Sequence, residues 1–393
     1  EVVEIPAKTV WIDRRIADHP ECRRRLEWVL PHVHCRDIRY CDGNPGEEFF
    51  SVSKRRHGKD DFSDDAVLAF TTYDSGRRGF YFHWRDEAAA HGGACQPAME
   101  LNIVEGCVFR CAYCGFGRRV HFTLDVDRLI GELEAVFAKH PEQRLYKFSN
   151  MTDLPAFEPE IDIVPPMVRR FSQETDRYLM LFTKSDNVAF LRDLDHRGHT
   201  IISWSLTADS PSRLLDKRTA TMDERIAAMA EMQKAGYIVR ARLSPIIPVR
   251  NWEKEYRALF EHMFACVQPD LVTLELLGWM KFDDLLAVIP PELLDGQMRE
   301  EARAAADSLK DVMWAPFTQD AHEKVYRFCI DTVRELSPRT PVSVCHGTAA
   351  TWKALGELTG MTPGEYICNC GPLSAPGGAL YDELHALHDG EGQ

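Results

Sequence analysis

One short run between Glu105 and Gly115 constrains this chain most, because it holds Cys107, Cys111 and Cys114 in a C-x3-C-x2-C spacing. Three thiolates so close in sequence can ligate one iron–sulfur cluster. Because such clusters normally take four cysteines, the spacing predicts that a ligand from outside the protein completes the set. A structural zinc site is the alternative, but zinc sites tend to pair two C-x2-C units, and no second pair follows this run.

Composition indicates an ordinary globular protein of 393 residues, 45% of them hydrophobic. Charged residues interrupt every apolar stretch well before the length that a membrane span needs, and residues 1–20 lack a signal-peptide core. We therefore expect a cytoplasmic protein with no membrane partner. Twelve cysteines in that compartment favour metal or redox chemistry over disulfides.

The formal net charge of −14 bears on the partner. Phosphate backbones attract basic surfaces and repel acidic ones, so this charge disfavours a nucleic-acid partner. It favours a small polar or cationic substrate instead.

Short β-rich runs alternate with amphipathic segments after residue 98, which is typical of β/α units around a parallel sheet. The predicted strands are 99–104, 145–149, 177–182, 200–206, 237–243 and 271–276, and the predicted helices are 124–139, 187–196, 222–235 and 253–266.

Six such units predict an α/β fold, a partial (β/α)6 barrel whose functional residues gather at the carboxyl ends of the strands. We expect three regions: an N-terminal cap over 1–98, a core barrel over 99–285, and a helical, cysteine-containing C-terminal extension over 286–393.

Beyond the cysteine run, separated segments resemble the radical S-adenosylmethionine (SAM) superfamily and, over roughly 60–285, its spore photoproduct lyase branch. Tyr113 supplies the aromatic residue that the superfamily usually carries before its third cysteine. The other segments, in order, are Ser149-Asn-Met-Thr-Asp153, Leu181-Phe-Thr-Lys184, Ser203-Trp-Ser-Leu206, Arg225-Ile-Ala-Ala-Met-Ala230, Lys234-Ala-Gly-Tyr237, Pro245-Ile-Ile-Pro248 and Leu271-Val-Thr-Leu-Glu-Leu276.

The resemblance implies that the three cysteines hold a catalytic [4Fe–4S] cluster, with SAM completing its ligand set. It also implies that Thr152, Lys184 and Ser205 contact SAM, whose carboxylate and ribose hydroxyls suit ammonium and hydroxyl partners. The further candidates for SAM binding are Tyr113, Ser149, Asn150, Asp153, Ser203 and Arg242, although Arg242 could instead pair with a buried acid.

Two positions depart from the family pattern. DNA-repair members carry a cysteine and a tyrosine that return hydrogen to the product radical, where this chain has Asn150 and Gly115. The departures favour consumption of SAM and a lyase or dehydratase reaction on an amino-sugar, similar to the radical diol dehydratases of aminoglycoside antibiotic biosynthesis. The alternatives are repair of a DNA photolesion, radical modification of a peptide, and a cluster protein that generates no radical. A flavodoxin or ferredoxin is the expected electron donor.

Carboxylates would receive a cationic substrate, and we expect them among Asp153, Glu158, Asp209 and Glu275. Each could instead cap a helix or form a surface ion pair. Thiols near the C-terminus are candidates for a second iron–sulfur cluster, provided that a fourth ligand completes the set. That set comprises Cys345, Cys368 and Cys370, with Cys329 or His346 as the fourth ligand.

Overall fold

The computed structural model describes residues 4–51, 66–72, 80–83, 93–109, 111–116 and 119–389. Its main sheet has eight strands in the order β15-β14-β13-β12-β11-β10-β7-β6. The seven strands from β15 to β7 are parallel and form a half-barrel, and β6 adds an antiparallel edge. The strands are β6 (Phe80–His83), β7 (Ala98–Leu101), β10 (Leu145–Phe148), β11 (Tyr178–Thr183), β12 (Thr200–Leu206), β13 (Ile238–Ile246), β14 (Leu271–Leu276) and β15 (Val342–Val344).

This sheet confirms the predicted fold class, and each of the six predicted strands is present within a few residues. The seventh parallel strand, β15, was not predicted. It is only three residues long, too short to show an alternating pattern in the sequence. Because β15 pairs with β14, the main sheet continues beyond residue 285 into the region expected to be a separate extension.

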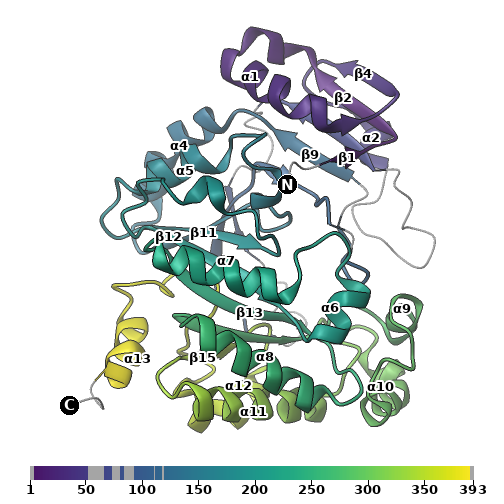
Figure 1. Ribbon diagram of the computed structural model, residues 1–393, viewed down its shortest axis with the longest axis vertical. Helices are drawn as coiled ribbons and strands as arrows, with labels where there is room; N and C mark the ends of the chain where they lie inside the picture. The colour runs from purple at the N-terminus through teal and green to yellow at the C-terminus, as the bar shows by residue number, and fades with distance from the viewer. Residues whose placement is uncertain are drawn as a thin grey trace.

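A second sheet of five strands lies at the N-terminal end of the molecule, beside α1 (Figure 1). The cysteine run connects β8 and β9, the last two strands in the order of this sheet. The strand order is β4-β2-β5-β9-β8, with β2 (Thr9–Asp13), β4 (Asp37–Cys41), β5 (Val67–Thr71), β8 (Val104–Glu105) and β9 (Arg119–Thr123), and β1 (Ile5–Pro6) pairs separately with β3 (Val33–His34).

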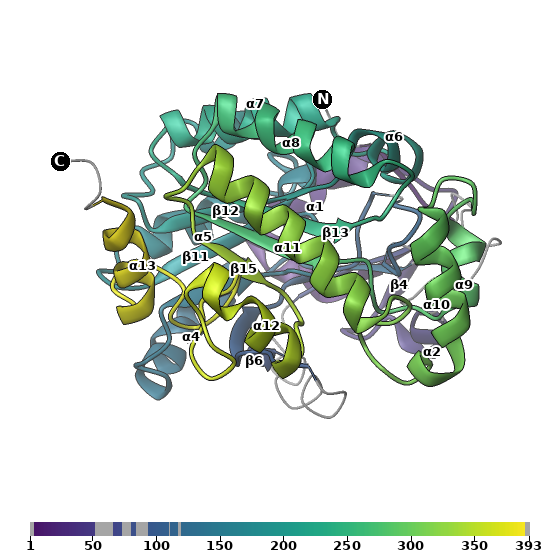
Figure 2. The same cartoon turned by 90° about the horizontal axis from the view of Figure 1, so that it is seen from below.

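Amphipathic helices cover the outer face of the half-barrel. Helix α4 (Val126–Lys139) buries Leu129, Leu133 and Phe137, which are spaced to share one helix face. In α7 (Met222–Lys234), Thr221 and Glu224 form a capping box that satisfies the first backbone N–H groups. Seen from below in Figure 2, α11 (Gln319–Leu336) lies between α8 (Trp252–Cys266) and α12 (Ala349–Thr359), and it packs against both.

The helix predicted over 187–196 is wrong. Only a 3-10 turn, η5 (Ala189–Leu191), forms there, because successive N–H groups bond to carbonyls three residues back. The remaining helices are α1 (Pro20–Val29), α2 (Gly46–Ser51), α5 (Val164–Phe171), α6 (Asp209–Leu215), α9 (Phe282–Val288), α10 (Gly296–Leu309) and α13 (Ala379–Asp389). Among the helices that the structure describes, none combines the length and the apolar character that crossing a membrane requires.

Candidate active site

A cavity of about 440 Å³ opens at the carboxyl ends of the parallel strands. Its wall includes Cys107, Cys111 and Cys114 together with residues that follow β10, β11 and β14. Segments far apart in sequence therefore meet at one edge of the sheet, as expected for a half-barrel.

Backbone contacts fix the cysteine loop at its entry. Gly106 has a φ of +94°, and a Cβ at this position would lie 2.2 Å from the carbonyl oxygen of Arg119, so only glycine fits. Within the loop, the N–H of Cys114 donates to the carbonyl of Cys111 at 3.0 Å. Burial raises the pKa values of Cys107 and Cys111, and negatively charged neighbours raise them further. A positively charged cluster would reverse this effect and favour the thiolates.

A network of charged side chains lies beside this loop. Lys184 donates from Nζ to Tyr113 Oη at 2.8 Å and to Asp216 Oδ2 at 3.0 Å. Asp216 also accepts hydrogen bonds from Tyr113 and from the buried guanidinium of Arg225, the latter at 2.8 Å. Burial opposes ionisation of Asp216, but Lys184 and Arg225 outweigh it and hold the pKa of this carboxyl well below its usual range. Sequence reasoning missed Asp216, which no motif marks.

The segment after β10 places its side chains in different environments. Asn150 and Thr152 line the cavity, and Asn150 Oδ1 and Thr152 Oγ1 are buried without a hydrogen-bond partner among the described residues. Ser149 instead accepts the N–H groups of Ile103 and Val104 at 3.0 and 3.1 Å, which supports the entry to the cysteine loop. The first two side chains are therefore placed to meet a ligand, and Ser149 has a structural contact.

Asp153 also lines the cavity, but protein groups occupy its carboxylate. It accepts hydrogen bonds from the backbone N–H of Lys184 at 2.6 Å and from the hydroxyl of Thr183 at 2.9 Å. Burial raises its pKa to about 6, although these hydrogen bonds favour the ionised form. Asp153 therefore holds the β10 loop against the end of β11.

The two serines predicted on β12 are two residues apart and share one face of the strand, but their surroundings differ. Ser205 lines the cavity. Ser203 is fully buried and donates its hydroxyl to Asn369 Oδ1 at 2.9 Å, so it anchors the C-terminal segment.

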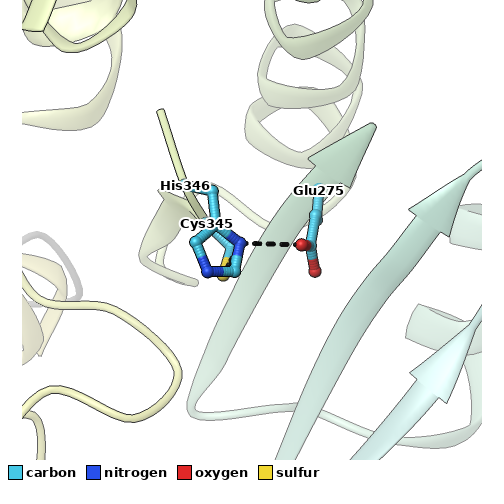
Figure 3. A group of neighbouring side chains, drawn as sticks. All are labelled: Glu275, Cys345 and His346. Atoms are coloured by element: carbon cyan, nitrogen blue, oxygen red, sulfur yellow. Dashed lines mark hydrogen bonds and ion pairs between the residues drawn. The ribbon is translucent and has the colours of Figure 1, made fainter. Parts of the chain in front are cut away.

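Arg242 and Glu275 form a partly buried ion pair on neighbouring strands, with Nη2 and Oε2 2.6 Å apart. His346 Nδ1 lies 2.8 Å from Glu275 Oε1 and 3.3 Å from Cys345 Sγ (Figure 3). Burial opposes the charge on His346, but Cys345 and Glu275 outweigh it and raise its pKa to about 10. Arg242 therefore pairs with a buried acid, which was one of its two predicted roles.

Glu158 and Asp209, two of the predicted substrate carboxylates, lie away from the cavity wall. Glu158 is buried and accepts three backbone N–H groups at the start of α5, including that of Val164 at 2.7 Å. Asp209 is exposed in the first turn of α6 and pairs with Arg213 at 2.9 Å. Helix N-termini attract carboxylates in this way, so sequence alone could not separate these side chains from substrate ligands.

The C-terminal thiols separate into two groups. Cys345 and Cys370 line the cavity, and Cys368 is buried next to Cys370. Cys329, the predicted fourth ligand, is fully buried on α11 in the hydrophobic core. Apolar burial on the core-facing side of a helix explains its position, and the structure does not bring it together with the other three.

The residues around the three-thiol loop fit the predicted cofactors. Three thiols at the cavity wall suit a cluster with one iron left for another ligand. Lys184 and the unpartnered Thr152 Oγ1 offer a cation and a hydroxyl at the same cavity. A parallel half-barrel with this loop at the carboxyl ends of its strands defines a protein of the radical SAM type.

Comparison with known proteins shows to which family the chain is similar. Residues 93–280 match the family model described as spore photoproduct lyase. The chain is 26% identical over 194 residues to spore photoproduct lyase of Bacillus subtilis (strain 168), covering 46% of this chain and 57% of that protein. The corresponding enzyme of Clostridium acetobutylicum is 22% identical over 176 residues, covering 42% and 52%. The chain thus spans about half the length of the curated relatives it matches.

Solved structures of spore photoproduct lyase share the fold. A mutant with bound AdoMet and dinucleoside spore photoproduct superimposes with a TM-score of 0.65 at 16% identity, over 87% of this chain and 99% of that one. Another mutant with the dinucleoside photoproduct gives 0.66 at 15% identity, over 86% and 98%. These matches confirm the predicted resemblance, and they bear out the predicted cofactors, a [4Fe–4S] cluster and SAM.

The same structures contradict the prediction that disfavoured a nucleic-acid partner, because similar proteins bind a dinucleoside photoproduct on this fold. Net charge was a poor guide, since it sums over the whole surface whereas binding depends on the local field. In this chain Lys147, Lys184 and Arg242 line the cavity together with Asp153, Glu275 and Asp284, so the overall charge of −14 does not describe the charge of the cavity. The predicted cytoplasmic location stays a prediction.

Proposed function

We propose that this chain is a radical SAM lyase that acts on a dinucleotide or nucleic-acid photolesion and uses SAM as a co-substrate. The observation that carries the proposal is the single cavity that joins the three-thiol loop to Lys184, Thr152 and Ser205. The matched proteins favour this alternative over the predicted dehydration of an amino-sugar.

The residues of the cavity have distinct roles in this proposal. Cys107, Cys111 and Cys114 hold the cluster, which together with SAM supplies a 5′-deoxyadenosyl radical for hydrogen abstraction. Lys184 binds the SAM carboxylate and Thr152 donates to a cofactor oxygen through its unpartnered hydroxyl. The Tyr113–Asp216 pair holds Lys184 in position from the opposite side.

Asn150 sets this chain apart from the repair enzymes that it resembles. An amide does not return a hydrogen atom as a thiol does, and Gly115 offers no phenol at the other position of the family relay. We therefore expect at least one 5′-deoxyadenosine for each product molecule, because SAM is not regenerated.

The test uses anaerobically reconstituted protein reduced with dithionite and supplied with SAM. We expect the dinucleoside spore photoproduct to stimulate 5′-deoxyadenosine formation and to yield the repaired dinucleoside, whereas the undamaged dinucleoside should do neither. An Asn150→Cys variant should lower the ratio of 5′-deoxyadenosine to product, since it restores a thiol at the relay position. Equal rates with damaged and undamaged dinucleoside would refute the proposal. Stimulation by an amino-sugar such as paromamine alone would support the dehydratase hypothesis instead.

A further inference from the structure

Three segments that are far apart in the sequence converge at the wall of the cavity that the cysteine loop also lines. Gly93 forms an antiparallel bridge with Thr348, and the N–H of Ala94 donates to the carbonyl of Gly347 at 2.8 Å. These contacts place Cys95 beside the turn that follows β15. The third segment joins through Gln96, whose side chain donates to the carbonyl of Tyr366.

The third segment, residues 366–371, is itself firmly anchored. Arg240 donates to the carbonyl of Asn369 at 2.7 Å, and Ser203 donates to its side chain. The N–H of Cys368 donates to Ser374 Oγ at 3.0 Å. Gly371 packs so closely on Gln96 that a Cβ there would lie 2.0 Å from its side-chain oxygen. The segment is therefore attached to two interior strands of the main sheet, β12 and β13.

Each of these segments contributes thiols to one place. Cys368 and Cys370 share a side-chain hydrogen bond, and both Cys95 and Cys345 lie close enough to raise the pKa of Cys368. Burial raises the pKa of Cys95, and Cys370 and Cys345 raise it further. All four thiols also lie close enough to Tyr366 to raise the pKa of its side chain. The contacts between the three segments thus gather four thiols at one place, as a metal centre with thiolate ligands requires.

We propose that Cys95, Cys345, Cys368 and Cys370 ligate a second iron–sulfur cluster in the wall of the substrate cavity. Four thiolates make the complete ligand set of such a cluster. Cys95 takes the place that sequence reasoning gave to Cys329. Because Cys345 and Cys370 line the same cavity as Cys107, the second centre faces the first across the space where substrate binds.

The spacing of the thiols favours a cluster over a single metal ion. Among the described residues, one group of histidine, cysteine and acidic side chains has all ligand atoms within 4.8 Å of one another, namely Glu275, Cys345 and His346. Neither the four thiols nor the three of the cysteine loop form so compact a group. Both sets are thus more open than a mononuclear zinc site, which draws its ligands to about 2.3 Å from one ion.

The compact group itself is a poor site for a cation. Glu275 already pairs with Arg242 at 2.6 Å, and it also accepts the hydroxyl of Ser244. His346 Nδ1 lies 2.8 Å from Glu275 Oε1, so the ring nitrogen that faces this group is already engaged by the carboxylate. Figure 3 shows the imidazole directed at the carboxylate in this way.

The test counts iron and acid-labile sulfide per chain after anaerobic reconstitution, and it requires no substrate. We expect about eight irons and eight sulfides in the wild-type protein, and about four of each when Cys107, Cys111 and Cys114 are all changed to alanine. That variant should keep a paramagnetic signal after dithionite reduction. Since the count is independent of catalysis, its failure is distinguishable from failure of the proposed lyase reaction.

Single variants then identify the ligands. Cys95→Ala should lose about half of the iron, whereas Cys329→Ala and the exposed Cys266→Ser should retain all of it. The proposal is overturned if the wild-type protein binds only about four irons and the cysteine-loop variant binds none. It is equally overturned by one zinc without sulfide that is lost on His346→Ala. Should a variant fail to fold, the wild-type count still decides.

Discussion

Removing the charge of Asp216 tests whether the network beside the cysteine loop depends on this side chain. The side chains of Asp216 and Arg225 are both fully buried, and their ion pair measures 2.8 Å. An Asp216→Asn substitution preserves the shape but leaves the Arg225 guanidinium without a counter-charge. Removal of one partner from a buried pair costs about 3–5 kcal/mol. Lys184 is partly buried and also loses its partner, which places the expected loss at the upper end of that range.

Asp209→Asn is the matched control, because it changes the same residue type in an exposed i,i+4 pair with Arg213. We expect it to change the free energy of unfolding by about 0.5 kcal/mol or less. Urea unfolding of both variants and of the wild type, followed by circular dichroism at constant protein concentration, measures the difference. Equal unfolding midpoints for the two variants would show that the ion-pair reasoning is wrong.

The pH dependence provides a second check on the same variant. Since Lys184 and Arg225 hold the folded-state pKa of Asp216 well below its usual range, the carboxylate stabilises the fold fully above the unfolded pKa of about 3.9. That contribution is lost as the pH falls through the lower, folded-state value. The difference in unfolding free energy between wild type and Asp216→Asn should therefore be constant near pH 7 and shrink in acid.

Further substitutions test the loop, the cofactor contact and a buried histidine. Gly106→Ala should lower the free energy of unfolding by about 1–3 kcal/mol and reduce the iron bound. The φ of Gly106 is positive, and the carbonyl oxygen of Arg119 on β9 would lie 2.2 Å from the new Cβ. Gly131→Ala, in the open middle of α4, should be neutral or stabilising. Lys184→Met should weaken SAM binding in equilibrium dialysis by roughly tenfold to a hundredfold, and the exposed Lys217→Met should not. Burial lowers the pKa of His322 to about 4, so stability should fall by up to about 3 kcal/mol between pH 6.5 and 4, and His322→Asn should abolish this dependence.

Local pattern made the main features of this protein predictable. The cysteine loop has a fixed spacing within eight residues, and the parallel strands are continuous apolar runs that the sequence shows directly. Lys184 and Ser205 could be found for the same reason, because each immediately follows or ends such a strand. For these two residues, the position at a strand end indicated the cavity correctly, whereas the residue type alone did not.

Contacts between distant segments were not predictable in the same way. Cys95 lies 250 residues before Cys345, and the contacts of Gly93 with Thr348 and of Ala94 with Gly347 bring them together. Asp216 follows the short helix α6 and meets Lys184 because two strand-end loops converge. Glu158 shows the reverse error, since a carboxylate near a strand end turned out to bind the backbone at the start of α5.

The C-terminal region is better understood as a wall of the active site than as an appended extension. Strand β15 joins the sheet through β14, and the chain that follows it carries Cys345 and His346 into the cavity. Asn369, which lies between Cys368 and Cys370, then contacts Ser203 on β12 and Arg240 on β13. The segments that form this cavity wall are thus attached to the strands of the sheet. A ligand that binds these thiols in the folded state should therefore stabilise the half-barrel. Binding there should therefore stabilise the same strands that present Lys184 and Ser205 to SAM.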